Sequence, residues 1–152
     1  MHAPIPNSEA CSGSALGLLF RQTRDAMWAR MERELAAAGH ELTFSQFIAM
    51  KKLTQGAASV TDLARTADLN PGAMTRLLDK LEARGLLVRV ADPGDRRALH
   101  IHLTEAGRTM WRDIDQCGQR VRERALHGMD EATRTRLTRL LEQARDNLLS
   151  QD

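Results

Sequence analysis

One stretch of this sequence breaks the helical pattern that dominates the rest of the chain. Apolar residues recur at three- and four-residue spacing along most of its length, which is typical of amphipathic helices. Residues 86–90 instead form a β-rich run, and residues 99–103 alternate an apolar residue with a histidine. Between them, residues 92–95 read Asp-Pro-Gly-Asp, a strong turn signal. The sequence therefore predicts a single β-hairpin over residues 86–103 in an otherwise helical chain.

Local start and stop signals divide the helical part of the chain into six segments. Thr43 and Gln46 have the spacing of a capping box, and Asn70 precedes a proline, which favours the first position of a helix. Gly39 and Gly85 follow apolar stretches and are expected to end their helices. The predicted helices cover residues 15–38, 44 to about 56, 59–68, 71–84, 105–127 and 131–149.

The composition is that of a small helical protein and excludes several classes of function. Aromatic residues make up 3% of the 152 residues, the net charge is +2, and no apolar run is long enough to span a membrane. The two cysteines, Cys11 and Cys117, lack the C-x-x-C spacing of a zinc or redox site. No phosphate-binding loop, dinucleotide-binding motif or metalloprotease motif occurs, so we expect no enzyme, no cofactor and no metal site.

The amino terminus has neither the basic start nor the apolar centre of a secretion signal. We therefore expect residues 1–14 to form a disordered arm and the protein to be cytoplasmic.

Three predicted elements in the middle of the chain form a constellation typical of DNA binding. A short helix, a tight turn and a longer helix over residues 59–84 make a helix-turn-helix, and the appended hairpin makes it winged. The major groove of DNA admits one α-helix, which is the role expected of residues 71–84. Residues 70–108 also carry seven basic against five acidic side chains, whereas both flanks are balanced. A solvated polar face remains the alternative for the helix taken alone.

The residues expected to contact DNA lie on the outer side of this unit. Met74 and its apolar neighbours on the second helix should point inward, leaving small and basic residues outside. At the hairpin, arginines beside the turn can enter a minor groove, and Asp92 or Asp95 could pair with one of them. The predicted DNA contacts are Ser59, Thr61, Asn70, Gly72, Ala73, Thr75, Arg76, Lys80, Asp95, Arg96 and Arg97.

Residues 59–107 resemble the MarR family of bacterial transcriptional regulators. Three pieces carry the resemblance: D-K-L-E-x-R-G-L-L-x-R at the end of the second helix, D-P-x-D-R-R-A at the hairpin turn, and L-T-E-A-G at the start of the next helix. The resemblance implies an obligate homodimer on a pseudo-palindromic operator in double-stranded DNA. Recognition helices would occupy successive major grooves and wings the flanking minor grooves, most often to repress transcription.

Apolar faces on the predicted outer helices agree with a dimer. The stripes of residues 15–38, 105–127 and 131–149 exceed what one small core needs, so a second subunit would cover the surplus. The expected division is a dimerisation helix over 15–40, a winged helix-turn-helix domain over 41–104 and C-terminal dimerisation helices over 105–152.

The resemblance further implies release from DNA by a small aromatic or phenolic effector. The pocket would lie between the DNA-binding unit and the dimerisation helices, where methionine and aromatic side chains suit a permissive apolar site. Each apolar candidate could equally be an ordinary core residue. The candidates are Met27, Met31, Phe47, Met50 and Trp111, with Arg76 as the partner of an anionic group.

Other readings stay open at this point. An oxidant sensor could act through Cys11 or Cys117, although Cys117 falls on an apolar helix face. His100 and His102 share a strand face but lack a third metal ligand, so exposed polar positions explain them better. A helical protein-interaction module would account for the helices but not for the basic hairpin. The sequence does not separate a repressor from an activator.

Overall fold

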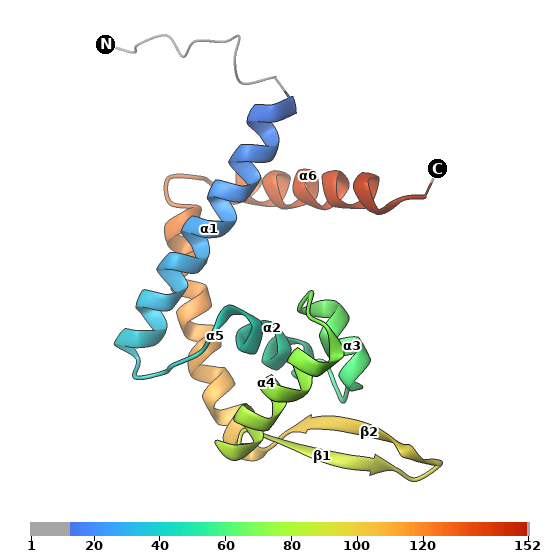
Figure 1. Cartoon of the computed structure of the whole chain (residues 1–152). Coiled ribbons are helices and arrows are strands. Elements are labelled where there is room, and N and C mark those ends of the chain that lie inside the picture. The colour runs from blue at the N-terminus through green and yellow to red at the C-terminus, as the bar shows by residue number, and fades with distance from the viewer. Residues whose placement is uncertain (1–12, 152) are drawn as a thin grey trace, which may run out of the picture.

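The computed structural model describes residues 13–151 and contains six helices and one two-stranded antiparallel sheet, as the sequence predicted. Figure 1 shows α1 and α5 running side by side as a spine, with the remaining elements attached at its two ends. The elements are α1 (Gly13–Ala37), α2 (Phe44–Leu53), α3 (Val60–Thr66), α4 (Pro71–Ala83), β1 (Leu87–Asp92), β2 (Asp95–Leu103), α5 (Glu105–Ala125) and α6 (Glu131–Leu149).

Helix starts follow the capping signals in the sequence. Thr43 Oγ1 accepts a hydrogen bond from the Gln46 amide at 3.2 Å, and Gln46 Oε1 accepts one from the Thr43 amide at 3.0 Å, which completes the capping box. Gly39 and Gly85 follow α1 and α4 with φ of +79° and +74°, the left-handed conformation that glycine adopts without steric cost. Helix α2 ends at Leu53, earlier than expected, because a turn already begins at Thr54. Helix α1 begins at Gly13, two residues before its predicted start.

One apolar core joins α1 and α5 to α2, α3, α4 and the base of the hairpin. Helix α5 contributes Ile114 and Cys117, both fully buried, and α4 contributes the inner face that its spacing predicted. We expected the apolar stripes of α1, α5 and α6 together to exceed one core. Helix α5 packs along α1 and buries its apolar face within its own chain, so the uncovered apolar residues lie on α1 and α6.

The hairpin is anchored at its base and projects at its tip. Ile101 and Leu103 are buried in the core, as their alternation predicted, and Ile101 also exchanges backbone hydrogen bonds with Ala58 at 2.8 and 3.2 Å. Leu99, expected on the same buried face, is instead 42% exposed. The alternation is correct, but the hairpin reaches beyond the body of the protein, so the third apolar position has nothing to pack against.

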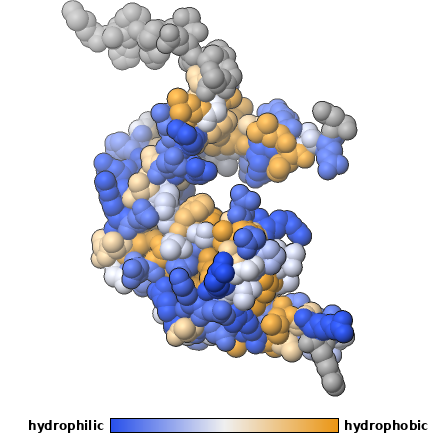
Figure 2. Space-filling view, in the orientation of Figure 1, coloured by the Kyte–Doolittle hydropathy of each residue, from blue (hydrophilic) through white to orange (hydrophobic). Residues whose placement is uncertain are grey.

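The apolar surfaces of α6 and of the first half of α1 are not covered by other described residues, although Arg134 of α6 pairs with Glu123 of α5 at 2.9 Å. No residue of α6 is buried, and four of its leucines are exposed. Figure 2 shows apolar surface on α6 and near the amino-terminal end of α1, across an open gap from α2, α3 and α4. None of the helices in residues 13–151 combines the length and apolar character needed to cross a bilayer.

Candidate nucleic-acid interface

Helices α3 and α4 are joined by a tight turn that sets one across the other. Leu69 donates its amide to the Ala64 carbonyl at 2.9 Å, and Asp68 adopts a left-handed conformation with φ of +53°, which aspartate tolerates better than most residues. Asn70 then caps α4 by accepting a hydrogen bond from the Ala73 amide at 2.8 Å. This arrangement is a helix-turn-helix, with α4 in the position of the recognition helix.

The outward face of α4 carries small side chains near its amino-terminal end and basic side chains further along. Gly72 and Thr75 are exposed near its amino-terminal end, and Arg76 and Lys80 follow one turn apart. Neither basic side chain has an ion-pair partner among the described residues, so both remain available for phosphates or base edges. The Thr75 hydroxyl donates to the Pro71 carbonyl at 2.9 Å, which leaves it to act as an acceptor toward DNA.

Two of the other predicted DNA contacts, Ser59 and Asn70, cap helices. Ser59 Oγ accepts a hydrogen bond from the Asp62 amide at 3.1 Å at the start of α3, as Asn70 does for α4. Thr61 is exposed and Ala73 half-buried. Because capping occupies the acceptor oxygen of Asn70, its amide NH₂ group is the part that remains free to donate to a phosphate.

Arg89 connects α4 to the wing, the hairpin formed by β1 and β2, and its role was not predicted from the sequence. Arg89 of β1 donates to Asp79 Oδ1 and to Glu82 Oε2, both at 2.7 Å, and to the Thr75 carbonyl at 3.3 Å. Its side chain is only 20% exposed. The contact holds the wing at a set angle to α4 and compensates two carboxylates beside the DNA-facing surface. The sequence held a signal for this role, because Arg89 is the last arginine of D-K-L-E-x-R-G-L-L-x-R and lies six residues after the end of α4.

The wing tip is organised by its two aspartates. Asp92 accepts hydrogen bonds from the Gly94 amide and from His100 Nε2, each at 2.8 Å, and these contacts lower the pKa of its carboxyl group. Asp95 accepts the backbone amide of Arg97 at 2.9 Å. We expected Asp92 or Asp95 to pair with one of the two guanidinium groups beside the turn. Neither carboxylate pairs with the guanidinium of Arg97, since both bind groups of the hairpin itself, and for Arg96 the pairing stays a prediction. Arg97 is exposed, and the side chain of Arg96 lies outside the described part of the chain.

The residues predicted to contact an effector do not line one common site in the structure. Met31 and Met50 are 5% and 0% exposed and belong to the core, so they offer no surface to a ligand. Met27 lines an open groove of about 640 Å³ between α1 and α5, whereas Trp111 lines a separate cavity of about 270 Å³. Phe47 is half-buried against Trp111, with ring centroids 5.5 Å apart, and Arg76 lies on the exposed face of α4.

Cys117 has the environment of a structural cysteine. It is fully buried, its Sγ lies 3.6 Å from the Glu34 carbonyl oxygen, and Arg120 Nη2 donates to it at 3.2 Å. Burial raises the pKa of the thiol, although the guanidinium of Arg120 opposes this shift. A buried neutral thiol is a poor nucleophile toward oxidants. Cys11 lies outside the described residues.

The exposed recognition helix and the wing fixed against it define a winged helix-turn-helix DNA-binding protein. Residues 42–99 match the sequence model of the MarR family. The chain belongs to the MarR family of transcriptional regulators, as the motifs of residues 59–107 indicated, and is a DNA-binding regulator and not an enzyme.

Known relatives agree along most of the chain. It is 25% identical to the HTH-type transcriptional repressor NicR of Pseudomonas putida over 95% of this chain and 91% of that protein. Bordetella bronchiseptica BpsR, described by the regulation of its DNA binding by 6-hydroxynicotinic acid, superposes with a TM-score of 0.73 at 26% identity, over 95% of this chain and 99% of BpsR. The transcriptional regulator PA3341 gives a TM-score of 0.75 at 31% identity over 88% and 97% of the two chains. Three further curated regulators match over only 40% to 49% of their own length.

Proposed function

We propose that this regulator is a repressor that binds a pseudo-palindromic operator as a homodimer and leaves it when a small aromatic effector binds. The observation that carries the proposal is the position of the unpartnered apolar surface. It lies on α6 and on the first half of α1, at the opposite end of the spine from the wing and α4. A second subunit attached there would leave both recognition helices free to face DNA.

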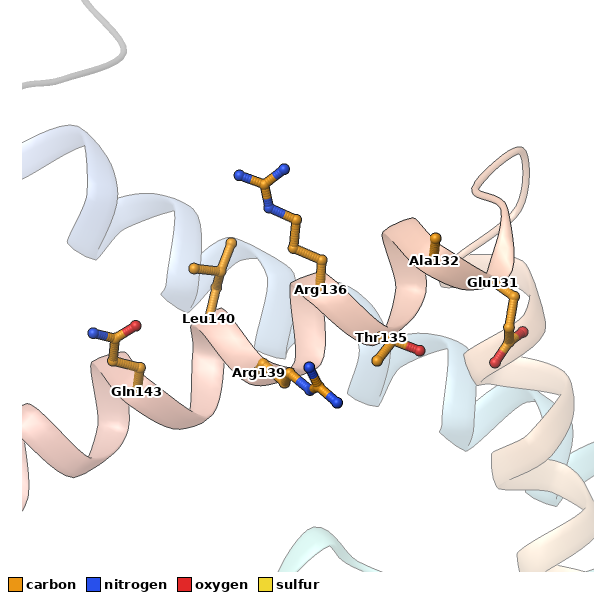
Figure 3. Close-up of a pocket in the computed structure, with 7 residues that line it drawn as sticks. All are labelled: Glu131, Ala132, Thr135, Arg136, Arg139, Leu140 and Gln143. Atoms are coloured by element: carbon orange, nitrogen blue, oxygen red, sulfur yellow. The ribbon is translucent and has the colours of Figure 1, made fainter.

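The exposed apolar side chains are concentrated where this second subunit would pack. Of the fourteen large exposed hydrophobic residues described, five lie on α1 between Leu16 and Met27, and four lie on α6 from Leu140 onward. A hollow of about 510 Å³ is lined by seven residues that all belong to α6, with Arg136 and Leu140 projecting from one side of the helix (Figure 3). A hollow bordered by one helix alone becomes an enclosed contact only when another chain covers it. A homodimer with two-fold symmetry covers both copies at once.

Each half of the operator would be read by one α4 and one wing. The exposed end of α4 would enter the major groove with Arg76 and Lys80 toward bases and phosphates, while Arg97 would reach a flanking minor groove. The two-fold axis would require half-sites about one helical turn apart, or a multiple of that distance. Binding to chromosomal DNA would place the protein in the cytoplasm.

Salt-dependent binding to duplex DNA tests this proposal. Operator candidates from the DNA upstream of the gene should bind with an affinity that falls steeply with salt, because each phosphate contact releases counterions. Scrambled duplexes of the same length serve as the control. Equal affinity for both duplexes would argue against sequence-specific recognition. No duplex binding at low salt would instead favour a protein-interaction module.

The effector part of the proposal draws support from two relatives. NicR is named a repressor, and BpsR is described by the regulation of its DNA binding by 6-hydroxynicotinic acid, a small aromatic acid. An effector that releases DNA must bind the free dimer more tightly than the DNA-bound dimer, and by linkage the operator must weaken effector binding by the same factor. Titration of the operator complex with aromatic acids and their uncharged analogues measures this coupling. If no compound displaces the protein at millimolar concentration, oxidation should be examined with Cys11→Ser and Cys117→Ser.

A further inference from the structure

A small cavity lies where the base of the wing meets α5 and the end of α2. It has a volume of about 270 Å³ and is bordered by the end of α2 with the residues that follow it, by β2 and by α5. Ligand pockets for drug-sized molecules span about 300–1,000 Å³, so this cavity suits a compound of one ring. Its lining residues are Leu53, Thr54, Gly56, Ala57, His102, Leu103, Arg108 and Trp111.

The polar groups around the cavity favour an anion. Arg108 of α5 and His102 of β2 both line it, and no aspartate or glutamate does. Neither side chain forms an ion pair or a side-chain hydrogen bond with another described residue. The nearby Arg89, by contrast, is already engaged by two carboxylates. A carboxylate entering the cavity would therefore meet a guanidinium that has no competing acid, the geometry that permits a charge-assisted bidentate contact.

The remaining wall is apolar and aromatic. Trp111 presents a half-buried indole beside the buried side chains of Leu53 and Leu103. Trp111 is also the end of a run of packed rings, since Phe47 lies 5.5 Å from it and Trp28 lies 5.6 Å from Phe47. Phe44 follows at 5.0 Å from Trp28, so four of the five aromatic residues in the sequence form one continuous contact. An aromatic ring in the cavity would extend this packing by one member.

We propose that the cavity bounded by Arg108, His102 and Trp111 binds a single-ring aromatic carboxylate. The carboxylate pairs with Arg108, with His102 as a second polar contact, and the ring packs on Trp111. This site deepens the proposed function by giving the effector a location, and it replaces most of the residues first expected for that role.

The site is placed to affect the wing. His102 pairs with Val88 in the hairpin, and Ala57 precedes Ala58, whose backbone bonds to Ile101 join the hairpin to the α2–α3 connection. Trp111 and Arg108 belong to α5, which runs from the wing into the spine. A ligand that contacts all three therefore acts on the junction that sets the position of the wing relative to the rest of the chain.

Direct binding to the free protein tests the site without DNA. The probe is benzoate, with benzamide as its uncharged analogue and cyclohexanecarboxylate as its non-aromatic analogue. Binding is followed by the fluorescence of Trp111 in a Trp28→Phe background and by calorimetry on the unsubstituted protein. We expect benzoate to bind and both analogues to bind at least about tenfold more weakly, since each lacks one of the two main contacts.

Substitution assigns the binding to these residues. Arg108→Gln is expected to weaken benzoate binding at least about tenfold, the effect of one lost charge-assisted hydrogen bond. Arg122→Gln, the same change elsewhere on α5 and outside the cavity, should leave benzoate affinity unchanged. Absence of benzoate binding at millimolar concentration, or equal binding by the wild type and Arg108→Gln, would overturn the proposal. Binding at Arg108 without release of operator DNA would instead uphold the site and contradict the effector part of the proposed function.

Discussion

Arg89 is the residue that most directly couples the two DNA-reading elements. Its guanidinium connects β1 to three groups on α4, so this one side chain helps to set the direction of the wing above its anchored base. Asp79 and Glu82 are 59% and 42% exposed, so the ion pairs themselves add only about 1 kcal/mol to stability after solvent screening. The larger effect concerns DNA, because without Arg89 two uncompensated carboxylates would face the phosphates.

We expect Arg89→Met to reduce operator affinity about tenfold or more while leaving the fold intact, since charge repulsion and a loosened wing act in both subunits. Fluorescence anisotropy with labelled operator over a range of salt concentrations measures the change. Adding Asp79→Asn and Glu82→Gln to Arg89→Met removes the repulsion but not the misalignment. The affinity recovered by this triple variant therefore reports the charge contribution alone, and unchanged affinity in Arg89→Met would contradict the role.

The wing tip carries a second prediction at the residue scale. Arg97→Ala, and to a lesser degree Arg96→Ala, should weaken operator binding by about 1–3 kcal/mol per lost contact, counted twice in a symmetric dimer. The thermal midpoint should not change, because Arg97 is exposed and its structural contact is through the backbone. Arg122→Ala on α5 makes the same charge change away from the wing and serves as the control, since Arg122 is exposed and has no ion-pair partner among the described residues. Wild-type affinity in both wing variants at physiological salt would show that the hairpin arginines do not contribute to DNA binding.

At the scale of the elements, the start of α5 packs closely against the backbone that leads into β1. Thr104 Oγ1 accepts a hydrogen bond from the Gly107 amide at 3.1 Å and donates to the Gly85 carbonyl at 2.6 Å. A Cβ atom at Gly107 would lie 2.1 Å from the backbone oxygen of Leu86, closer than any real contact. The L-T-E-A-G motif therefore ends in glycine because α5 lies directly against the entry to β1.

Gly107→Ala should lower the free energy of unfolding by about 3 kcal/mol, because backbone must move to admit the methyl group. Gly118→Ala in the same helix is the matched control, since a Cβ there meets nothing within 4 Å. That variant should gain about 0.5–1 kcal/mol from helix propensity. Urea unfolding of both proteins gives the two values. A Gly107→Ala protein as stable as the wild type would show that α5 can shift away from β1 at little cost.

At the scale of the whole molecule, the two ends of the spine differ in how well their apolar residues are covered. The core is complete around α4, α5 and the hairpin base, yet α6 contributes nothing to it. One end therefore forms a stable DNA-reading unit, and the other exposes the apolar surface that the proposed second subunit would cover.

We predict a dimeric mass in light scattering at micromolar concentration. Replacing Leu140 and Leu141 together by aspartate should shift the protein toward monomer, because each leucine buried at an interface contributes about 1.5–3 kcal/mol and symmetry doubles the loss. Leu99→Asp is the control, since Leu99 is also exposed but lies on the wing. A monomeric wild type, or a double variant that remains dimeric, would contradict the assignment of α6 to the interface.

The local features of this fold were readable in the sequence because the interactions that create them span only three or four residues. Caps at Thr43, Asn70 and Thr104, the glycine after α4 and the turn at residues 92–95 all have their partners close in the chain. The same holds for the inner and outer faces of α4, which follow from helical spacing. The candidate DNA-contact surface was predictable to that extent.

Contacts between distant residues were decided only by the tertiary structure. Whether an apolar stripe is buried depends on what lies opposite. Helix α5 packs along α1, as Cys117 meets Glu34 across 83 positions, whereas the apolar face of α6 is not covered by any described part of its own chain. Leu99 has the same periodicity as Ile101 but lies beyond the body of the protein. The ion pairs of Arg89 with α4, and the ring contacts that connect α1, α2 and α5, also join separate elements. Periodicity specifies which face of an element is apolar, but the packing of the chain determines which surface covers it.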